Sequence, residues 1–507
     1  MSLNKDSNNS VDSDMVWLSY VVVLASALVL YTVSCAPGTV WQDSGMIQYR
    51  VWHNDIEGRL GLALSHPLFY MVAIAAKYIP LGEFGYRVNM VTAVISAVAV
   101  ANLFLLLRLW LGKTFPALIG AATLALSHTF WRHAAIPETY NLYIALLLAE
   151  LIVLLQYFRT KRMSFLYALG LFNGLAIANH MLASIGFACY AVLLLALLLK
   201  KQISFKSLGI IVVLWVIGAA PYEYLIVKNI VQTGDLSATF SSALFGTRYK
   251  SDVLNVLLSA RIIKENVIWI LLNFPTPNIL LFLPGIFTVY KLAPARAFAN
   301  VLLALLVLFL AFAFRYTIVD RYAFFIPFYC MVSLLVGVGA HYSIVLKNRK
   351  TLAYIVIVFT LLPILAYVAA PVVARKVGIQ SGRKREIPYR DDHEYFLRPW
   401  RTGYEGAERF ANEALDTVEP AAIIFADSTI APPLLYVQEV NGRRKDVKII
   451  SGLVSSEDSP EFNEQTIEKL LTERAVYVVS PVPGYCPQFL LERYEFKQAG
   501  VLWKVVD

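Results

Sequence analysis

An aspartate in the segment Trp41-Gln42-Asp43-Ser44-Gly45 is the residue of this sequence best suited to chemistry. It follows a long apolar stretch and lies between an aromatic residue and small residues, which places its carboxylate at a boundary between lipid and water. Partial removal from water raises the pKa of a carboxylate, and a carboxylate within hydrogen-bond reach of an incoming hydroxyl can take its proton. The sequence therefore predicts Asp43 as a general base. A helix-cap or turn aspartate is the alternative.

Other ionisable residues gather at the ends of predicted helices on the side that carries Asp43. Ionisable groups at helix ends in a membrane are expensive unless solvated or paired, and they often mark a site. The alternative is that each is an ordinary hydrated loop charge. The group contains His53, His66, His128, His133, His180, Asp55, Glu57, Glu138, Arg50, Arg59, Arg87, Arg132, Asp320 and Arg321.

The composition defines the elements that must position these residues. The chain has 507 residues, of which 58% are hydrophobic and 16% are charged. A soluble protein has about a quarter of its residues charged, so this chain is predicted to be a polytopic membrane protein. The net charge of +9 comes from the part before residue 374, where basic loops and anionic lipid account for it. No basic and aromatic surface segment indicates nucleic-acid binding.

The apolar stretches predict about eleven membrane-spanning helices, each crossing a hydrocarbon layer of about 30 Å. They lie near residues 16–36, 86–108, 115–130, 139–158, 164–178, 181–199, 208–227, 266–290, 297–314, 322–345 and 351–371. With a cytoplasmic N-terminus, every tight basic cluster between spans falls on the cytoplasmic side, as the positive-inside rule requires. The first span is expected to be retained because the tail before it, with Asp6, Asp12 and Asp14, is a poor signal-peptide start.

The same topology places residues 37–85, residues 228–265 and everything after about 372 outside the cytoplasm. Residues 66–79 are apolar but too short to span a membrane, and they stop at Pro80. They are predicted to form a helix that lies in the membrane interface, with Lys77 reaching toward water. A re-entrant segment is the alternative.

The tail has the alternating pattern of a soluble α/β domain with a partly parallel sheet. We therefore divide the chain into a membrane domain, 1–373, and an extracytoplasmic domain, 374–507. Asp427 follows the first predicted strand and is expected to cap the next helix, with a site at the end of the strand as the alternative. The predicted strands are 421–427, 447–450 and 475–479, and the predicted helices are 402–416, 431–440 and 464–474.

Several short motifs follow one another in a recognisable order. They are Asp43 after the first span, Ser65-His66-Pro67-Leu68, Tyr86-Arg87-Val88-Asn89, Ser127-His128-Thr129-Phe130-Trp131, Glu138-Thr139-Tyr140-Asn141-Leu142, Asn179-His180 and Asp320-Arg321-Tyr322. Over most of residues 16–330 this order resembles the GT-C superfamily, and more narrowly its bacterial branch related to protein O-mannosyltransferases.

The resemblance implies a GT-C-like helical membrane enzyme that transfers a sugar from a polyprenyl-phosphate donor to a hydroxyl acceptor outside the cytoplasm. It implies that Asp43 is the catalytic base in the first outer loop and that Glu138 assists it. Direct displacement by an activated hydroxyl would invert the anomeric centre. Because Ser44 follows Asp43, the chain lacks the paired acidic dipeptide of some eukaryotic relatives, which weakens a direct transfer of their protein-mannosylating activity.

A phosphate leaving group requires cationic partners, for which arginine is best suited. The expected phosphate ligands are Arg87, Arg132, His180 and Arg321. Further substrate contacts are expected from His66, Asn89, His128, Trp131, Tyr140, Asn179 and Asp320. The alternatives are that Arg321 pairs with Asp320, that Asn179 and His180 cap a helix, and that His128 and Trp131 are interfacial anchors.

A single phosphate can be neutralised by arginines, so neither a metal nor another cofactor is expected. The expected partners are the lipid-linked donor, a protein, lipid or glycan acceptor, and the membrane, which is expected to be a bacterial inner membrane. A secondary transporter and a non-enzymatic envelope scaffold are the competing interpretations. A transporter would favour internal repeats and ionisable groups at the membrane midplane, whereas here these groups lie at outer helix ends.

Overall fold

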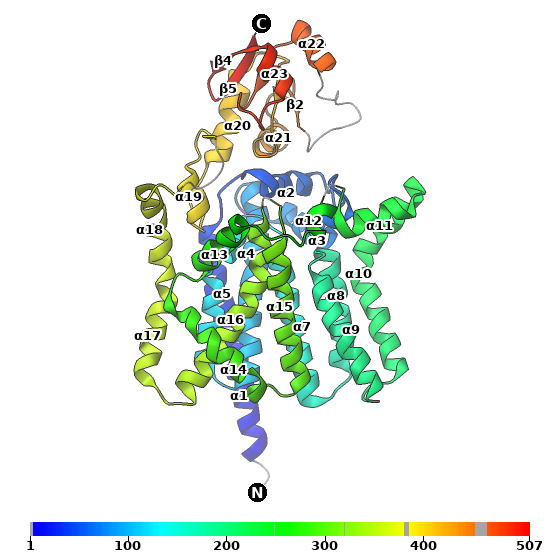
Figure 1. The fold of residues 1–507 in the computed structure, drawn as a ribbon, viewed down its shortest axis with the longest axis vertical. Coiled ribbons are helices and arrows are strands. Elements are labelled where there is room, and N and C mark those ends of the chain that lie inside the picture. The colour runs from blue at the N-terminus through cyan, green and yellow to red at the C-terminus, as the bar shows by residue number, and fades with distance from the viewer. Residues whose placement is uncertain (1–3, 248, 319, 380–384, 452–463, 507) are drawn as a thin grey trace.

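The computed structural model describes residues 4–506 apart from 248, 319, 380–384 and 452–463. It consists of a layer of upright helices with a small sheet-containing domain at one end (Figure 1). The N-terminus lies at the end of the helical layer opposite this domain. The predicted combination of a helical membrane protein with a C-terminal α/β domain is confirmed.

Six helical segments in the described chain are long and apolar enough to cross a membrane, or eight if two bent pairs each count as one span. The single segments are Met15–Ser34 within α1 (Asn4–Ser34), α4 (Phe84–Leu111), α7 (Tyr140–Thr160), α10 (Phe205–Thr233), α15 (Arg296–Arg315) and Arg321–Val345, which contains α16 (Ile326–Ala340). The bent pairs are α13 (Ala260–Asn273) with Pro277–Leu292, which contains α14 (Phe282–Leu292), and α17 (Lys350–Leu361) with α18 (Pro363–Lys376).

Both bent pairs correspond to spans that the sequence predicted as continuous helices. The first pair bends by 99° and the second by 44°. Pro277 and Pro363 each begin the second part of their pair, where a proline lacks the N–H that a helix interior needs. Three other predicted spans correspond to shorter apolar helices, α5 (Thr114–Ala125), α8 (Ser164–Asn179) and α9 (Ala183–Leu199).

Short helices lie across the ends of the upright helices that face the C-terminal domain (Figure 1). The predicted helix at 66–79 is present as α3 followed by a 3₁₀ turn, and its start at Pro67 suits a proline at the first helical position. The elements of this outer layer include α2 (Gln42–Trp52), α3 (Pro67–Ile74), α6 (His128–Ala134), α11 (Leu236–Phe245) and α12 (Lys250–Leu254).

A polar network crosses the interior of the helical layer. Glu150 on α7 is fully buried and accepts hydrogen bonds from Asn173 Nδ2 at 3.2 Å and Tyr190 Oη at 2.9 Å. The Oδ1 atom of Asn173 in turn accepts a hydrogen bond from Trp215 Nε1 at 3.0 Å. These four side chains connect α7, α8, α9 and α10.

We expect Glu150→Ala to lower the free energy of unfolding by about 2–4 kcal/mol, because it leaves buried donors unsatisfied. Glu150→Gln keeps an acceptor oxygen in nearly the same volume and is expected to lower it by less than half as much. Thermal unfolding in detergent measures both variants. Equal losses for the two variants would contradict a hydrogen-bonding role for this side chain.

The C-terminal domain contains a five-stranded sheet with the order β2-β1-β3-β5-β4. The predicted strands are confirmed, and β1 pairs in parallel with both β2 and β3. The sequence analysis missed an antiparallel hairpin of β4 and β5 that turns at Gly500, whose φ is +56°. The strands are β1 (Ile423–Phe425), β2 (Lys448–Ile450), β3 (Val476–Val478), β4 (Glu495–Ala499) and β5 (Leu502–Val506), and the helices are α19 (Asp392–Leu397), α20 (Gly406–Thr417), α21 (Ala431–Glu439), α22 (Glu464–Glu473) and α23 (Gln488–Arg493).

The prediction that Asp427 caps a helix is wrong. The N-cap of α21 is Ile430. Asp427 Oδ1 instead accepts the Thr429 N–H at 2.8 Å, and the carboxylate forms an ion pair with Arg385 at 2.6 Å. Through these two contacts, the Asp427 carboxylate orders the loop between β1 and α21.

Direct hydrogen bonds join the C-terminal domain to the outer layer. Trp41 Nε1 donates to the Tyr404 hydroxyl at 2.6 Å, and the Tyr436 hydroxyl accepts the Gly85 N–H at 2.7 Å. The Gln42 N–H donates to the Thr429 carbonyl at 3.2 Å. Two of these bonds involve the residues immediately before Asp43, so the domain helps to fix the start of α2.

Candidate active site

A cavity of about 770 Å³ lies where the outer layer meets the C-terminal domain. Its walls come from α2, the connections α6–α7 and α8–α9, the segment before α16, α11, α12 and the tail. Its lining combines polar side chains with aliphatic and aromatic side chains such as Leu244, Phe312 and Phe324. This mixture suits a ligand with a polar head and an apolar chain.

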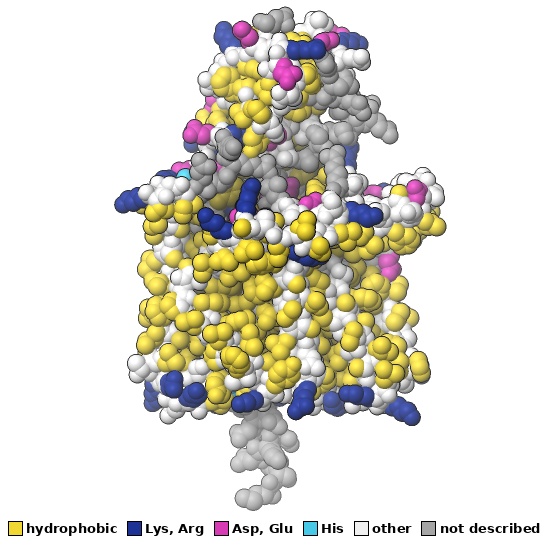
Figure 2. Space-filling view, in the orientation of Figure 1, with side chains coloured by type: hydrophobic (Ala, Val, Ile, Leu, Met, Phe, Trp, Pro, Cys, Tyr) yellow, Lys and Arg dark blue, Asp and Glu magenta, His cyan; other side chains and the backbone are white. Residues whose placement is uncertain are grey.

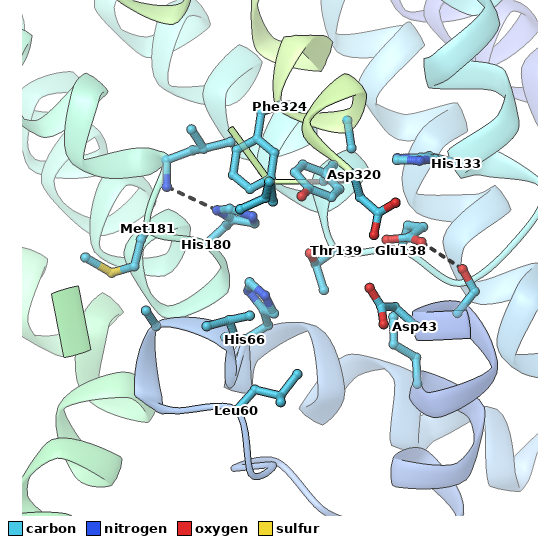
Figure 3. Close-up of a pocket in the computed structure, with 18 of the residues that line it drawn as sticks. Asp43, Leu60, His66, His133, Glu138, Thr139, His180, Met181, Asp320 and Phe324 are labelled. Carbon is cyan, nitrogen blue, oxygen red and sulfur yellow. Dashed lines mark hydrogen bonds between the residues drawn. The ribbon is translucent and has the colours of Figure 1, made fainter. Parts of the chain in front are cut away.

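Three carboxyl groups from distant parts of the chain converge in this cavity, and Figure 3 shows Asp43, Glu138 and Asp320 directed toward one another. Asp43 lies in the first turn of α2, whose N-cap is Trp41, so Asp43 is not the capping residue. The positive end of the helix dipole favours an ionised carboxylate at that position.

Glu138 lies just before α7 and is held by a hydrogen bond from the Ser44 hydroxyl at 2.7 Å. Burial raises the pKa of Glu138 to about 8, and the negative charges of Asp43 and Asp320 act in the same direction. The hydrogen bond from Ser44 and the charge of Arg132 oppose this shift. Glu138 therefore carries a proton at neutral pH, which limits the repulsion among the three carboxyl groups.

We expect the free energy of unfolding to fall as the pH rises from about 4.5 to about 8. The contribution of Glu138 to this fall is expected to be a few kcal/mol. Over this interval the folded chain keeps a proton that the unfolded chain has lost. Glu138→Gln removes the titration, so its stability relative to the parent protein should rise across the same interval. Thermal unfolding in detergent at a series of pH values measures this, and a constant difference would contradict the raised pKa.

Arg132 on α6 supplies a positive charge to the cavity. Only 4% of the residue is exposed, and its guanidinium lies 5.1 Å from the ring of Tyr395 and 5.6 Å from the ring of Tyr322. Its Nε atom is buried without a hydrogen-bond partner, and within the described ranges no carboxylate forms an ion pair with it. The tyrosine rings and the acidic groups of Glu138 and Asp320 offset part of the cost of burying this charge, and a bound anion would add the direct ion pair that it lacks among the described residues.

Two histidines face the cavity with different tautomers. His66 Nδ1 lies 2.7 Å from the Asn179 carbonyl oxygen and must donate to it, which leaves Nε2 as an acceptor. His180 Nδ1 accepts the Leu182 N–H at 3.1 Å, so Nε2 of the neutral ring carries the proton. Burial lowers the pKa of His66 to about 4 and the pKa of His180 well below its ordinary value. The expected cationic role of His180 therefore changes to that of a neutral N–H donor.

The structure brings together only part of the set expected from the sequence. The members that line the cavity are Asp43, Glu138, Arg132, His180, His66, Tyr140 and Asp320. The members outside its lining are Arg87, Arg321, Asn89, His128, Trp131 and Asn179.

The two arginines outside the cavity are occupied elsewhere. Arg87 donates to the carbonyl oxygens of Lys77 and Ile79, and so holds the end of the turn after α3. Arg321 forms an ion pair with Glu265, not with Asp320 as the alternative expected, and its guanidinium lies 4.5 Å from the ring of Trp269. Neither guanidinium is placed to bind a phosphate in the cavity.

The other four residues outside the cavity have structural contacts. Asn89 is fully buried and donates to the Ala36 carbonyl oxygen at 2.8 Å, and Asn179 donates to the Thr139 carbonyl oxygen at 3.0 Å. His128 and Trp131 are buried, so neither is an interfacial anchor. The His128 ring lies 5.2 Å from that of Tyr367, and the Trp131 ring lies 5.5 Å from that of Trp400, between α19 and α20.

The sequence analysis placed Arg50 in the group of ionisable residues near Asp43 without assigning it a role in the site, and it missed the lining residues from the tail. Arg50 donates to the Tyr70 hydroxyl at 2.7 Å and lines the cavity. A signal for it existed, because Arg50 lies seven residues after Asp43 and therefore on the same face of α2. No comparable signal pointed to Tyr395, Ser428 or Ser451, since only the packing of the two domains brings them to the cavity.

The expectation that the site needs no metal ion remains a prediction. In the part of the chain that the structure describes, no group of three or more His, Cys, Asp and Glu side chains is arranged to hold a metal ion.

Comparison with known proteins yields matches in sequence and in fold. Residues 64–204 match the family described as Protein O-mannosyl-transferase TMEM260 N-terminal domain. The Protein O-mannosyl-transferase TMEM260 of Mus musculus is 26% identical over 219 residues, which cover 41% of this chain and 30% of the mouse protein. The match thus spans less than a third of that relative's length.

Among solved structures, ArnT from Cupriavidus metallidurans bound to undecaprenyl phosphate has a TM-score of 0.60 at 12% identity, with 96% of this chain and 97% of that chain covered. The archaeal oligosaccharyltransferase AglB from Archaeoglobus fulgidus, in complex with an inhibitory peptide and a dolichol-phosphate, has a TM-score of 0.46 at 15% identity and covers 90% and 69%. The chain therefore has the GT-C fold that its motifs predicted, and its residues 64–204 resemble the N-terminal domain of the TMEM260 protein O-mannosyl-transferases.

Proposed function

We propose that this chain is a membrane glycosyltransferase that moves a sugar, in the first instance mannose, from a polyprenyl-phosphate donor to a hydroxyl acceptor. The observation that carries the proposal is the presence in one cavity of the Asp43 carboxylate and of the Arg132 guanidinium, which forms no ion pair with a carboxylate of the described residues. A base for the acceptor and a cation for the leaving phosphate are the two groups that such a transfer needs.

The reaction is a direct displacement at the anomeric carbon. Asp43 takes the proton of the acceptor hydroxyl while the acceptor oxygen forms a bond to that carbon. The bond between the carbon and the phosphate oxygen breaks, and polyprenyl phosphate leaves with the electron pair. Attack from the face opposite the leaving group inverts the configuration, by the logic that applies to inverting glycosidases.

Arg132 and the Nε2–H of His180 are the groups that we assign to the phosphate. Both side chains line the cavity. The Arg132 guanidinium contacts aromatic rings, and the His180 ring accepts one backbone N–H at Nδ1, so both side chains retain N–H groups that can donate to a phosphate. Arginine can bind two phosphate oxygens at once, and its charge does not depend on pH in the working range. In this mechanism the neutralisation of one phosphate requires no metal ion.

The charge distribution supports an extracytoplasmic site. Figure 2 shows a row of Lys and Arg side chains along the edge of the apolar band opposite the C-terminal domain. The positive-inside rule assigns that edge to the cytoplasm. The cavity and the C-terminal domain then face the other compartment, where a lipid-linked sugar replaces the nucleotide sugars of the cytoplasm. We place the protein in the inner membrane of a bacterium.

The test is a transfer assay with the purified full chain and synthetic polyprenyl-phosphate mannose. A Thr-containing peptide, a polyprenyl-linked glycan and a free glycan are offered as acceptors, each with and without EDTA. We expect release of polyprenyl phosphate coupled to glycosylation of one acceptor, inverted configuration in the product by NMR, and no loss with EDTA. Binding of the donor without transfer to any acceptor, or transport of the lipid alone, would contradict the proposal.

A further inference from the structure

A second, smaller pocket of about 230 Å³ is formed by the end of α2, the 3₁₀ turn after α3 and the start of α4. It is lined by Trp52, Lys77, Phe84 and Arg87, and it shares none of these residues with the cavity that contains Asp43. No carboxylate lines it. Two cations between aromatic walls suit the binding of an anion.

Both cations keep N–H groups that no described residue uses. Lys77 Nζ donates to the Trp52 carbonyl oxygen at 2.6 Å and to Asn54 Oδ1 at 2.7 Å, which leaves one of its three N–H groups. Arg87 donates through Nη1 to two backbone carbonyl oxygens, at 2.9 and 3.4 Å, and its Nε is buried without a hydrogen-bond partner. Among the described residues neither cation forms an ion pair, and this includes the exposed Glu83 that directly precedes α4.

The length of α4 places this pocket at the level of the lipid headgroups. The helix has 28 residues and is therefore about 42 Å long, more than the hydrocarbon core of about 30 Å and close to the about 40–45 Å of a bilayer with its headgroups. Arg87 lies in the first turn of this helix, and so in the headgroup region on the side of the C-terminal domain. Tyr78, next to Lys77, and Leu81, in the turn before α4, are exposed and suit contact with lipid.

We propose that this pocket binds the phosphate of an anionic membrane lipid, one whose headgroup carries no amine to cancel the charge, such as phosphatidylglycerol. The phosphate oxygens accept hydrogen bonds from Lys77 and Arg87, and the acyl chains extend toward the hydrocarbon core. An amine-bearing headgroup is disfavoured because no carboxylate lines the pocket to pair with it.

The site does not depend on the proposed function, but it bears on the helix that carries the proposed base. Lys77 holds the carbonyl of Trp52, the last residue of α2, and Asp43 lies in the first turn of the same helix. A lipid phosphate in the pocket therefore stabilises the end of α2 opposite the base.

The test is a lipid competition on the purified full chain by native mass spectrometry, with equal amounts of phosphatidylglycerol, phosphatidylethanolamine and phosphatidylcholine. The parent protein should retain phosphatidylglycerol in preference to both other lipids. Lys77→Gln removes one charged hydrogen bond and should lower the affinity for phosphatidylglycerol about tenfold, with the affinity for phosphatidylcholine unchanged. Lys77→Arg keeps the charge and should retain the preference. Lys264→Gln, a change at an exposed lysine of α13 outside the pocket lining, is the matched control and should leave the preference unaltered.

Two further measurements separate this lipid from other anions. Inorganic phosphate in large excess should not displace phosphatidylglycerol, and the thermal shift that undecaprenyl phosphate produces should be the same in Lys77→Gln as in the parent protein. Displacement by inorganic phosphate would identify a soluble anion as the ligand, and a lost shift would assign the pocket to the sugar donor, so either result would overturn the lipid site. No preference of the parent protein for phosphatidylglycerol, or equal losses in Lys77→Gln and Lys264→Gln, would overturn it as well.

Discussion

Asp43→Asn is expected to lower kcat for sugar transfer by about a thousandfold, since a positioned general base contributes about 10²–10⁴ to the rate. Asparagine has nearly the same shape as aspartate and cannot accept the acceptor's proton. The hydrogen bond from Ser44 to Glu138 does not involve Asp43, and loss of the Asp43 charge from the first turn of α2 costs only about 0.3–1 kcal/mol. Expression, thermal stability and the thermal shift with undecaprenyl phosphate should therefore remain close to those of the parent protein.

The matched control for this variant is Asp235→Asn. Asp235 caps α11 through a hydrogen bond from the Ala238 N–H at 2.8 Å, an interaction that asparagine retains, and its side chain lies outside the cavity lining. The control should keep full activity. Transfer by Asp43→Asn within tenfold of the parent rate would remove Asp43 from the mechanism, whereas equal loss in both variants would indicate a general effect of removing acidic charge.

Arg132→Ala is expected to lower kcat/KM for the donor by about 10²–10³, the range found when one donor to a developing negative charge is removed. It should also abolish most of the thermal shift that undecaprenyl phosphate produces. Because Arg132 has no carboxylate partner among the described residues, its removal leaves no carboxylate unpaired, and the ligand-free protein should lose little stability. Arg132→Lys keeps the charge but loses the planar fork, so we expect an intermediate result.

Arg87→Ala is the informative comparison for this variant. The sequence grouped Arg87 with Arg132 as a phosphate ligand, whereas its guanidinium holds backbone carbonyls near α3 in the structure. We expect Arg87→Ala to change thermal stability more than donor affinity. If it lowered donor affinity as much as Arg132→Ala does while stability stayed constant, the assignment of the phosphate to the cavity would be wrong.

The sequence alone determined the class of protein and the positions of most elements. Hydropathy is a property of consecutive residues, so the apolar helices, the helix after Pro67 and the parallel strands of the tail were each predicted near their observed bounds. Asp43 could be selected for the same reason, because its position beside the first span is local in the sequence. The breaks near Pro277 and at Pro363 were less predictable, since their apolar neighbours continue the pattern of one span.

Only the tertiary structure decided which of the polar residues meet. Arg132 lines the cavity and Arg321 is paired with Glu265, although both lie at outer helix ends and are equally good phosphate ligands by residue type. The partners are distant in the sequence, since Arg321 and Glu265 are 56 residues apart, and spacing along the chain does not show which of these residues meet. The same holds for Ser428 and Ser451, which line the cavity that contains Asp43 because the C-terminal domain packs against the outer layer. Local sequence fixes what each residue can do, and long-range packing fixes which residues do it together.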